Sequence, residues 1–479
     1  MKTFRPIAST KKKKPADVAT RSKRKSDKKA FKSSPEERAT RPMREDLIMQ
    51  SCLEAYGSVR HEGRLADRAL DFTLRPKRNL YSTERRAVAE RVYALLRRQR
   101  TVDWMLEHAR PGFEAMQTSQ KDVLRICASR VLHGESAGKV AVQASLSELD
   151  QATILALPEA ASALSALPPV KRFPIAASLP DFLAAKFLKV FGARAEAEAE
   201  ALNERAPLTI RTNTLKTDRD SLRSRLESEG VIARNTPLSP FGLHLETHLN
   251  AFSLPSFKDG LFEIQDEGSQ ILGMLVDAPP TRVVDACAGA GGKSLQLAAQ
   301  MTNRGELFAL DISGRRLEEL KKRARRAGAH NIRIKEIAPT GPEARETVKE
   351  LAGKMDRVLV DAPCSGTGTF RRKPDSRYRL TEEMLADHVA RQKDLLGRFS
   401  ELVKPGGRVV YGTCSVLPEE DEAVVDAFLE EHPDFVRLPV ADKLGEALAA
   451  KVSTDGYLRL TPFQHNTDGF FGTILQRRV

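Results

Sequence analysis

The segment that decides the fold is Arg-Val-Val-Asp-Ala-Cys-Ala-Gly-Ala-Gly-Gly-Lys-Ser, residues 282–294. Its apolar start predicts a short buried strand, and its glycines predict a turn that leads directly into a helix. Such a turn lets a ligand approach the backbone and the positive end of the helix dipole. The segment therefore predicts an α/β domain with a binding site at the carboxyl end of this strand.

Two common nucleotide-binding motifs do not fit this turn. A P-loop requires a glycine five positions before the Gly-Lys pair, where this chain has Cys287. A dinucleotide-binding fingerprint requires a third glycine at the position of Ser294. The turn therefore supports neither ATP hydrolysis nor nicotinamide binding.

The rest of the C-terminal half alternates short apolar strands with amphipathic helices, which predicts a mainly parallel, doubly wound sheet. The predicted strands are residues 282–287, 306–312, 332–337, 357–363 and 408–414, with two more at 458–462 and 470–476. Asp311 ends the second strand, at the position where an acidic residue of an α/β sheet binds a ribose diol. The alternative to this binding role is an ordinary aspartate at a strand end. Pro418-Glu-Glu-Asp421 predicts a helix start with acidic residues at the positive end of the dipole.

Two cysteines follow strand ends in segments rich in turn residues. Cys364 stands in Asp361-Ala-Pro-Cys-Ser-Gly, and Cys414 stands in Thr-Cys-Ser. Neighbouring strands lie ~4.8 Å apart, so we expect the two thiols to face each other at the carboxyl edge of the sheet. Most cysteines are inert buried residues, which is our interpretation of Cys52 and Cys127. No histidine lies near either strand-end thiol and zinc generally takes four ligands, so we expect no metal.

These two cysteine motifs, on a sheet opened by the glycine turn, resemble the Nop/Sun (Fmu) family of RNA cytosine-5 methyltransferases. The resemblance runs from about residue 179 to the C-terminus and includes Arg211-Thr-Asn-Thr-Leu-Lys216, Gln265-Asp-Glu-Gly-Ser-Gln270, Arg371-Arg-Lys-Pro-Asp375 and Asp468-Gly-Phe-Phe471. Residues 84–106 resemble the NusB-like RNA-binding domain of the bacterial ribosomal RNA members. The resemblance implies a Rossmann-like methyltransferase sheet that uses S-adenosyl-L-methionine.

The resemblance also implies roles for individual residues. Cys414 would be the nucleophile that adds to carbon 6 of cytosine, Cys364 would aid release of the product, and Asp361 would hold the base or the cofactor. A paired base buries carbon 6, so the target would be single-stranded or flipped out. The cofactor pocket would be lined by Cys287, Ala288, Gly289, Ala290, Gly291, Gly292, Lys293, Asp311 and Asp361.

Two positions depart from the family pattern. Ala290 stands where the glycine turn commonly has proline, which leaves the loop less rigid in the unfolded ensemble. Ala338 stands near the end of the third strand, where the family usually has an acidic residue that reaches the adenine side. We expect the contact with adenine either to be supplied elsewhere or to be lost.

For RNA we expect contacts from Arg211 and from the basic triplet after the Cys364 loop, which consists of Arg371, Arg372 and Lys373. The alternative for the triplet is a solvated loop. The expected substrate is ribosomal RNA, because the NusB-like region separates those members from the transfer-RNA ones. The alternatives are a transfer-RNA cytosine-5 methyltransferase and a non-catalytic ribosome-assembly factor that binds RNA.

Composition and pattern divide the chain into four parts and a linker. Residues 44–166 predict an all-α NusB-like bundle, residues 160–174 a linker, residues 175–250 a small α+β RNA-binding subdomain, and residues 251–479 the catalytic domain. Residues 1–43 predict a disordered basic tail, because residues 1–44 hold 16 Lys and Arg against 4 Asp and Glu. That segment carries +12 of the formal net charge of +14.

The same composition limits the class of protein. Hydrophobic residues make up 41% of the 479 residues, which is enough for a sizeable core. No stretch reaches the ~18 apolar residues of a membrane span, and the start of the chain lacks an apolar secretory signal. Five cysteines scattered over a long chain do not predict a disulfide framework. We therefore expect a cytoplasmic, reduced, monomeric protein with no membrane partner.

Removal of residues 1–42 tests the role of the basic tail, for which the alternatives are a solubilising segment, a transit peptide and a nuclear signal. The truncated chain should bind RNA more weakly and with a smaller dependence on salt, because fewer cations displace counterions from the phosphates. Filter binding between about 50 and 200 mM salt measures this slope. Binding of cofactor serves as the control and should not change, whereas an unchanged salt slope would contradict the tail's role.

Overall fold

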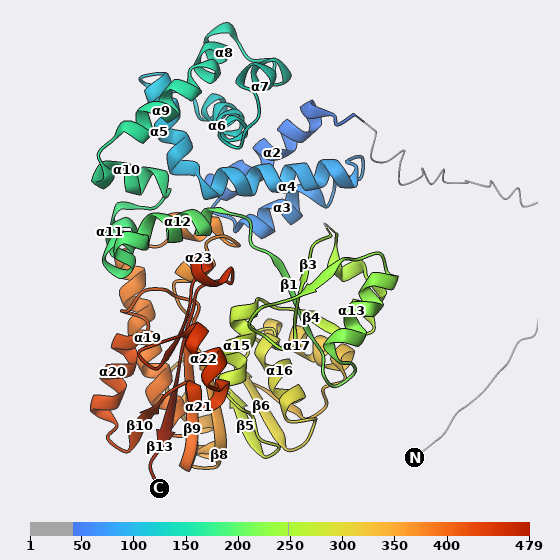
Figure 1. The fold of residues 1–479 in the computed structure, drawn as a ribbon, viewed down its shortest axis with the longest axis vertical. Coiled ribbons are helices and arrows are strands. Elements are labelled where there is room, and N and C mark those ends of the chain that lie inside the picture. The colour runs from blue at the N-terminus through green and yellow to red at the C-terminus, as the bar shows by residue number, and fades with distance from the viewer. Residues whose placement is uncertain (1–41, 248) are drawn as a thin grey trace, which may run out of the picture. The chain divides into compact units, whose positions relative to one another are not determined.

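The computed structural model describes residues 42–247 and 249–479. The predicted basic tail therefore lies outside the described residues, except for its last two. Residues 44–479 form one compact unit (Figure 1). No helix in the described ranges is long and apolar enough to cross a bilayer.

The predicted doubly wound sheet is confirmed. Strands β5 to β9 run parallel in the order β9-β8-β5-β6-β7, and β13 pairs antiparallel with β9 and continues the sheet through β12 and β11, with β10 paired to β13. The strands are β5 (Arg282–Asp285), β6 (Glu306–Asp311), β7 (Ile332–Glu336), β8 (Met355–Asp361), β9 (Val403–Thr413), β10 (Phe435–Leu438), β11 (Ser453–Thr454), β12 (Tyr457–Leu460) and β13 (Phe470–Arg477).

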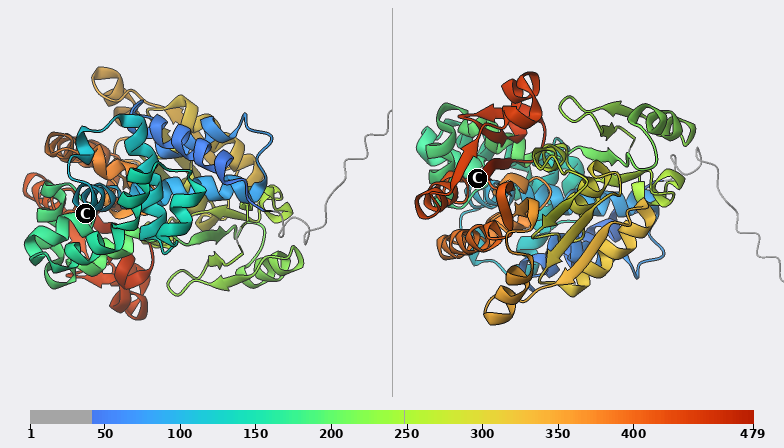
Figure 2. Two further views of the ribbon diagram at one scale, coloured as in Figure 1. Left: turned by 90° about the horizontal axis from the view of Figure 1, so that it is seen from above. Right: turned by 90° about the horizontal axis from the view of Figure 1, so that it is seen from below.

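Helices cover both faces of this sheet (Figures 1 and 2). One apolar core joins the strands to α18, α19 and α20, and a second joins them to α15, α16, α17 and α22. The central strands are apolar because both of their faces are buried. The helices of this part are α15 (Glu267–Leu275), α16 (Gly292–Gln300), α17 (Gly314–Ala327), α18 (Pro342–Leu351), α19 (Glu382–Ser400), α20 (Glu422–Glu431), α21 (Ala441–Leu444), α22 (Glu446–Val452) and α23 (Pro462–His465), with short 3₁₀ turns η4 (Thr367–Thr369) and η5 (Pro374–Tyr378).

A small antiparallel sheet precedes the large one. Its strand order is β2-β3-β1-β4, and α13 and α14 pack on it around their own apolar core. Its fourth strand pairs with β1 through Ile264, so this sheet extends past the predicted boundary at residue 250. The elements are β1 (Leu208–Thr212), α13 (Arg219–Ser228), β2 (Ala233–Asn235), β3 (Gly242–Leu245), η3 (Ala251–Ser253), α14 (Pro255–Lys258) and β4 (Phe262–Ile264).

The N-terminal part of the unit is helical. A single apolar core runs from Ile48 to Ala160 and joins the helices to one another. The elements are α2 (Glu45–Arg60), α3 (Ala66–Leu74), α4 (Ser82–Arg97), α5 (Gln99–Ala109), η1 (Phe113–Ala115), α6 (Thr118–Leu132), α7 (Ala137–Gln143), α8 (Glu148–Leu155) and α9 (Leu157–Ala166).

The predicted linker at residues 160–174 is wrong, because two helices occupy it. These are α9 and α10 (Pro169–Ala176). Proline at the first positions of a helix replaces amides that have no intrahelical partner, so Pro158 and Pro169 start these helices. Alanine has the highest helix propensity, and the alanines of this stretch extend α9.

Two further helices, α11 (Asp181–Phe191) and α12 (Ala195–Asn203), are joined by the short turn η2 (Gly192–Arg194). Although we predicted them within the α+β subdomain, their apolar side chains pack on residues of the catalytic part. The shared core includes Phe370, Leu380 and Leu417. These helices therefore lie against the loops that carry the two cysteine motifs.

Arg377 connects the helices to the catalytic part. Its side chain is completely buried and donates to Asn203 Oδ1 at 2.6 Å, to Arg97 O at 3.1 Å and to Leu202 O at 3.3 Å. These acceptors lie at the C-terminal ends of α4 and α12, where carbonyl groups lack intrahelical donors and carry partial negative charge. One guanidinium thus satisfies two helix ends and fixes both against η5.

Replacement of Arg377 tests this junction. Arg377→Met should lower the free energy of unfolding by about 3–5 kcal/mol, because several buried carbonyls lose their donor. Urea unfolding of the full chain measures the change. Arg315→Met is the matched control, because Arg315 is exposed on α17, and it should change stability by less than about 0.5 kcal/mol. Equal stability of the two variants would contradict the role given to Arg377.

Candidate active site

Two cysteine thiols face each other at the carboxyl edge of the large sheet. Strands β8 and β9 are parallel neighbours whose last paired residues are Asp361 and Gly412, and the two cysteines follow shortly after. The Sγ atoms of Cys364 and Cys414 are 3.2 Å apart. Both residues are partly exposed, and they follow strand ends at the edge where such sheets bind ligands.

The loops that carry the two thiols are bonded to each other. Thr367 Oγ1 accepts a hydrogen bond from the amide of Val416 at 3.0 Å and lies 3.1 Å from Ser415 Oγ. The amide of Gly368 donates to the carbonyl of Cys414 at 3.0 Å. These bonds lie beyond each cysteine in the chain and hold the two thiols at a fixed separation.

The surroundings of the Cys364 sulfur favour its protonated form. The hydrogen bond to Cys414, together with burial, raises the pKa of Cys364 well above its usual value. A protonated Cys364 can donate its S–H to the Cys414 sulfur. Within the described ranges, no group of three or more His, Cys, Asp and Glu side chains is placed to hold a metal ion.

Asp311, at the end of β6, is hydrogen-bonded to the glycine turn after β5. The amide of Gly289 donates to Asp311 Oδ2 at 2.8 Å, and the amide of Ser313 donates to Oδ1 at 2.8 Å. Gly289 and Gly291 have φ of +54° and +86°, a backbone conformation that favours glycine. A Cβ on Gly289 or Gly292 would meet nothing within 4 Å, whereas one on Gly291 would meet Leu320 at 2.0 Å.

This turn fits the cofactor expected from the sequence. The space in front of Gly289 and Gly292 lets a ligand reach the backbone at the start of α16, where helix amides attract negative charge. Ala288 is buried. Cys287 is partly exposed as a residue, but burial of its thiol raises the pKa of Cys287, so the thiol stays protonated. The predicted cofactor residues therefore lie together around one open turn.

Lys293 and Asp361 link this turn to β8. Lys293 Nζ lies 2.7 Å from Asp361 Oδ2 and 5.4 Å from the centre of the Phe470 ring. Asp285, at the end of β5, is buried and accepts from Ser294 Oγ at 2.6 Å, and burial raises its pKa to about 6. The ion pair places one positive and one negative side chain between the glycine turn and the thiols.

The two departures from the family pattern have structural surroundings that the sequence did not predict. The carbonyl of Ala290 accepts a hydrogen bond from Arg323 Nη1 at 2.7 Å, which restrains the turn where proline is absent. Strand β7 ends at Glu336, opposite Asp311, two residues before Ala338. Glu336 Oε1 accepts from the amide of Gly314 at 3.1 Å, so this strand does place a carboxylate beside β6.

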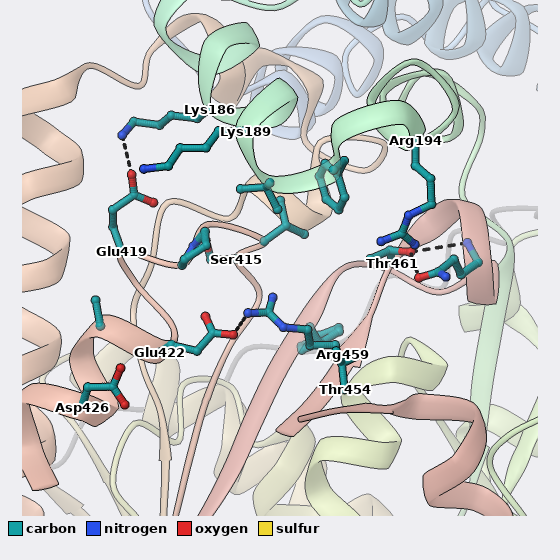
Figure 3. Close-up of a pocket in the computed structure, with 17 residues that line it drawn as sticks. Lys186, Lys189, Arg194, Ser415, Glu419, Glu422, Asp426, Thr454, Arg459 and Thr461 are labelled. Carbon is teal, nitrogen blue, oxygen red and sulfur yellow. Dashed lines mark hydrogen bonds and ion pairs between the residues drawn. The ribbon is translucent and has the colours of Figure 1, made fainter. Parts of the chain in front are cut away.

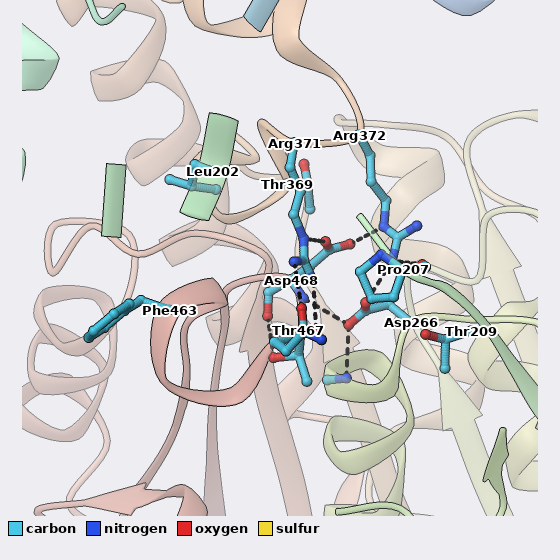
Figure 4. Close-up of polar contacts among 12 residues, drawn as sticks. Leu202, Pro207, Thr209, Asp266, Thr369, Arg371, Arg372, Phe463, Thr467 and Asp468 are labelled. Atoms are coloured by element: carbon cyan, nitrogen blue, oxygen red, sulfur yellow. Dashed lines mark hydrogen bonds and ion pairs between the residues drawn. The ribbon is translucent and has the colours of Figure 1, made fainter. Parts of the chain in front are cut away.

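The predicted RNA contacts divide into internal and exposed side chains. Figure 4 shows Arg371 and Arg372 paired with Asp468. Arg211 is buried with its Nε 2.6 Å from Gln265 Oε1, and Arg371 is buried with its Nε 2.9 Å from Asp468 Oδ1. Both guanidinium groups serve internal acceptors, so a direct phosphate contact from either is not supported. Arg372 is partly exposed and pairs with Asp266 and Asp468, and Lys373 is exposed.

A cavity of about 630 Å³ opens beside the Cys414 loop (Figure 3). It is lined by Ser415 and Val416, which directly follow the cysteine, and by side chains of α11, α20 and β12. Lys186 pairs with Glu419 across it at 2.6 Å, and Arg459 pairs with Glu422. These two ion pairs neutralise part of the charge on its walls.

Two carboxylates that the sequence did not place near the thiols face inward. Glu420 and Asp421, which we predicted at the positive end of a helix dipole, are completely buried. Thr413 Oγ1 donates to Asp421 Oδ1 at 2.6 Å, and Glu420 accepts from the loop of Cys364. Their position between the Thr-Cys-Ser motif and α20 was the only sequence signal that they could be near the thiols.

Comparison with known proteins places the chain among methyltransferases. A family model described as 16S rRNA methyltransferase RsmB/F matches residues 274–476, and one described as an RsmF/B-like ferredoxin-like domain matches residues 179–251. A probable ribosomal RNA small subunit methyltransferase B of Synechocystis sp. is 30% identical over 86% of this chain and 95% of its own length. A Bacillus subtilis protein of the same description is 33% identical over 65% of this chain and 69% of its own length. The crystal structure of PH0851 superposes on 91% of this chain and 99% of its own chain with a TM-score of 0.72 and 23% identity, which supports the fold.

Asp311→Ala tests whether the carboxylate at the end of β6 binds the cofactor. The variant should bind S-adenosylhomocysteine roughly 10–100-fold more weakly, because a charge-assisted hydrogen bond contributes about 1.5–3 kcal/mol. Isothermal titration calorimetry measures the affinity. Asp394→Ala, on the exposed side of α19, is the control and should bind as the unaltered chain does. An unchanged affinity of the Asp311 variant would contradict this placement.

Proposed function

The chain belongs to the 16S rRNA methyltransferase RsmB/F family, and on that premise we propose that it methylates carbon 5 of a cytosine in ribosomal RNA of the small subunit. The cofactor is S-adenosyl-L-methionine. The observation that carries the cytosine-5 assignment is the contact of 3.2 Å between the Cys364 and Cys414 sulfurs beside the glycine turn. A methyl transfer to an oxygen or to an exocyclic amine needs no such pair of thiols.

The chemistry of cytosine explains the need for a cysteine. Carbon 5 is a poor nucleophile until a thiolate adds to carbon 6 and moves the electron pair of the double bond towards carbon 5. S-adenosyl-L-methionine supplies the electrophilic methyl group. A base then takes the proton from carbon 5, the double bond re-forms, and the carbon–sulfur bond breaks with its electron pair on the sulfur. The enzyme must therefore provide both a nucleophile and a stable leaving group.

We assign the nucleophile to Cys414 and the release step to Cys364. The raised pKa of Cys364 keeps its proton at neutral pH, so Cys364 can donate a hydrogen bond to Cys414. Such a bond stabilises the Cys414 thiolate before the addition. It stabilises the same thiolate again when the carbon–sulfur bond breaks, which explains how a second thiol helps release.

Asp361 and Lys293 suit the contact with the base and the cofactor. Asp361 ends β8, three residues before Cys364, and its side chain is about one third exposed. Its Oδ2 is held by Lys293, which fixes the carboxylate at the edge of the sheet. We propose that Asp361 accepts a hydrogen bond from the Watson–Crick edge of the flipped base.

For RNA we propose contacts on exposed side chains near this edge, in place of the buried arginines. Helix α3 presents Arg68 and Phe72, with Phe72 62% exposed, and the following turn presents Arg75. Arginine and an exposed aromatic ring suit phosphates and unstacked bases. The start of α3 is joined to the catalytic part, because Arg379 Nη1 donates to Gly63 O at 2.7 Å.

Trapping of the covalent adduct tests the two roles. Cys364→Ala should accumulate a protein–RNA adduct that survives denaturation, because the release step loses its thiol. Cys414→Ala should form no adduct and should lose methyl transfer roughly a thousandfold or more. Denaturing gel electrophoresis with labelled small-subunit ribosomal RNA measures the adduct, and Cys127→Ala is the control because Cys127 is buried in the helical core. An adduct in the Cys414 variant would reverse the assignment.

A further inference from the structure

The carboxylate of Glu420 lies buried behind the loop that carries Cys364. It receives the amide of Ser365 on Oε1 at 2.8 Å and the hydroxyl of Ser365 on Oε2. Oε1 also accepts from Gln392 Nε2 at 3.0 Å. Both oxygens accept hydrogen bonds, as an ionised carboxylate does.

Gln392, on α19, also forms hydrogen bonds that hold this loop. Its side chain is completely buried, and its Nε2 donates to Pro363 O at 3.0 Å as well as to Glu420. The residues on both sides of Cys364 are therefore bonded to one carboxylate–amide pair. The pair leaves Cys364 little freedom to turn away from Cys414.

The charge of Glu420 also acts on the Cys364 thiol. The groups that face this thiol are the Cys414 sulfur, the Glu420 carboxylate, the Tyr411 ring of β9 and the amide of Gly366. Tyr411 donates its hydroxyl to the carbonyl of Glu420 at 2.6 Å and stays neutral. In the described part of the chain, Glu420 is buried and forms no ion pair with a lysine or arginine. A negative charge beside a thiol disfavours ionisation of that thiol.

We propose that Glu420, held by Gln392, is a positioning residue that keeps Cys364 a protonated thiol directed at Cys414 and so gives the two cysteines their separate roles. The proposal rests on the proposed function for those roles, but the state of the thiols is a property of the protein alone. The consequence is that Cys364 keeps its proton, which leaves the facing sulfur of Cys414 as the nucleophile.

Alkylation of the individual cysteines tests the proposal without RNA or cofactor. The full chain is treated with iodoacetamide between about pH 6 and 9, and mass spectrometry follows Cys364 and Cys414 separately. In the unaltered chain, Cys414 should react faster than Cys364 at pH 7. Glu420→Gln keeps the size of the side chain but removes its charge, so Cys364 should react about tenfold faster at pH 7, because a larger fraction of its sulfur ionises.

Matched variants separate charge from shape. Glu419→Gln makes the same change one residue earlier on a partly exposed side chain and should leave the Cys364 rate unchanged. Glu420→Asp retains the charge and should keep Cys364 slow. Cys52 and Cys127 are buried in the helical core and should stay unreactive in every folded variant.

Two results would overturn the proposal. The first is a Cys364 rate in Glu420→Gln that equals that of the unaltered chain over the whole pH range. The second needs no variant and therefore holds even if Glu420→Gln does not fold: Cys364 in the unaltered chain reacts at pH 7 as fast as Cys414. If the alkylation rates are as expected but the chain transfers no methyl group to RNA, the proposed function is contradicted. The role of Glu420 in thiol ionisation is supported in that case.

Discussion

The pairing of β8 with β9 is the constraint on which the catalytic edge depends. Both strands run parallel in the centre of a sheet that is buried on both faces, so their carboxyl ends meet at one edge. The register places Asp361 opposite Gly412, and the two loops that follow bring the thiols into contact. The glycine turn follows β5, the next strand of the sheet after β8, so the turn and the thiols lie at the same edge.

A second constraint comes from arginines that have no exposure to solvent. Arg371 and Arg377 follow the Cys364 loop and are buried, one against Asp468 and the other against the ends of α4 and α12. Arg97, at the end of α4, donates to the carbonyl of Arg371 at 3.0 Å. The segment after Cys364 is thus where the helices, the small sheet and the C-terminal strands meet. These contacts hold the helical part against the segment that follows Cys364.

The strands and the positions of the two cysteines could be predicted because their causes are local. Short apolar runs that end in turn residues define β5, β6, β8 and β9, and the parallel order of a doubly wound sheet brings their ends together. The partners of charged residues could not be predicted in the same way. A basic triplet in the sequence does not reveal that Arg371 lies against Asp468, 97 residues later, or that Lys373 alone is fully presented to solvent. The linker prediction failed for a different reason, because proline and alanine occur both in linkers and in the first turns of helices.

We propose that the paired thiols direct methylation to carbon 5 of cytosine. The test uses small-subunit ribosomal RNA that carries tritium at carbon 5 of its cytidines, together with the full chain and S-adenosyl-L-methionine. One tritium should enter the water for each methyl group transferred, because the hydrogen on carbon 5 must leave before Cys414 is released. Methyl transfer with all of the tritium retained in the RNA would place the methyl group on another atom and contradict the proposed role of the thiols.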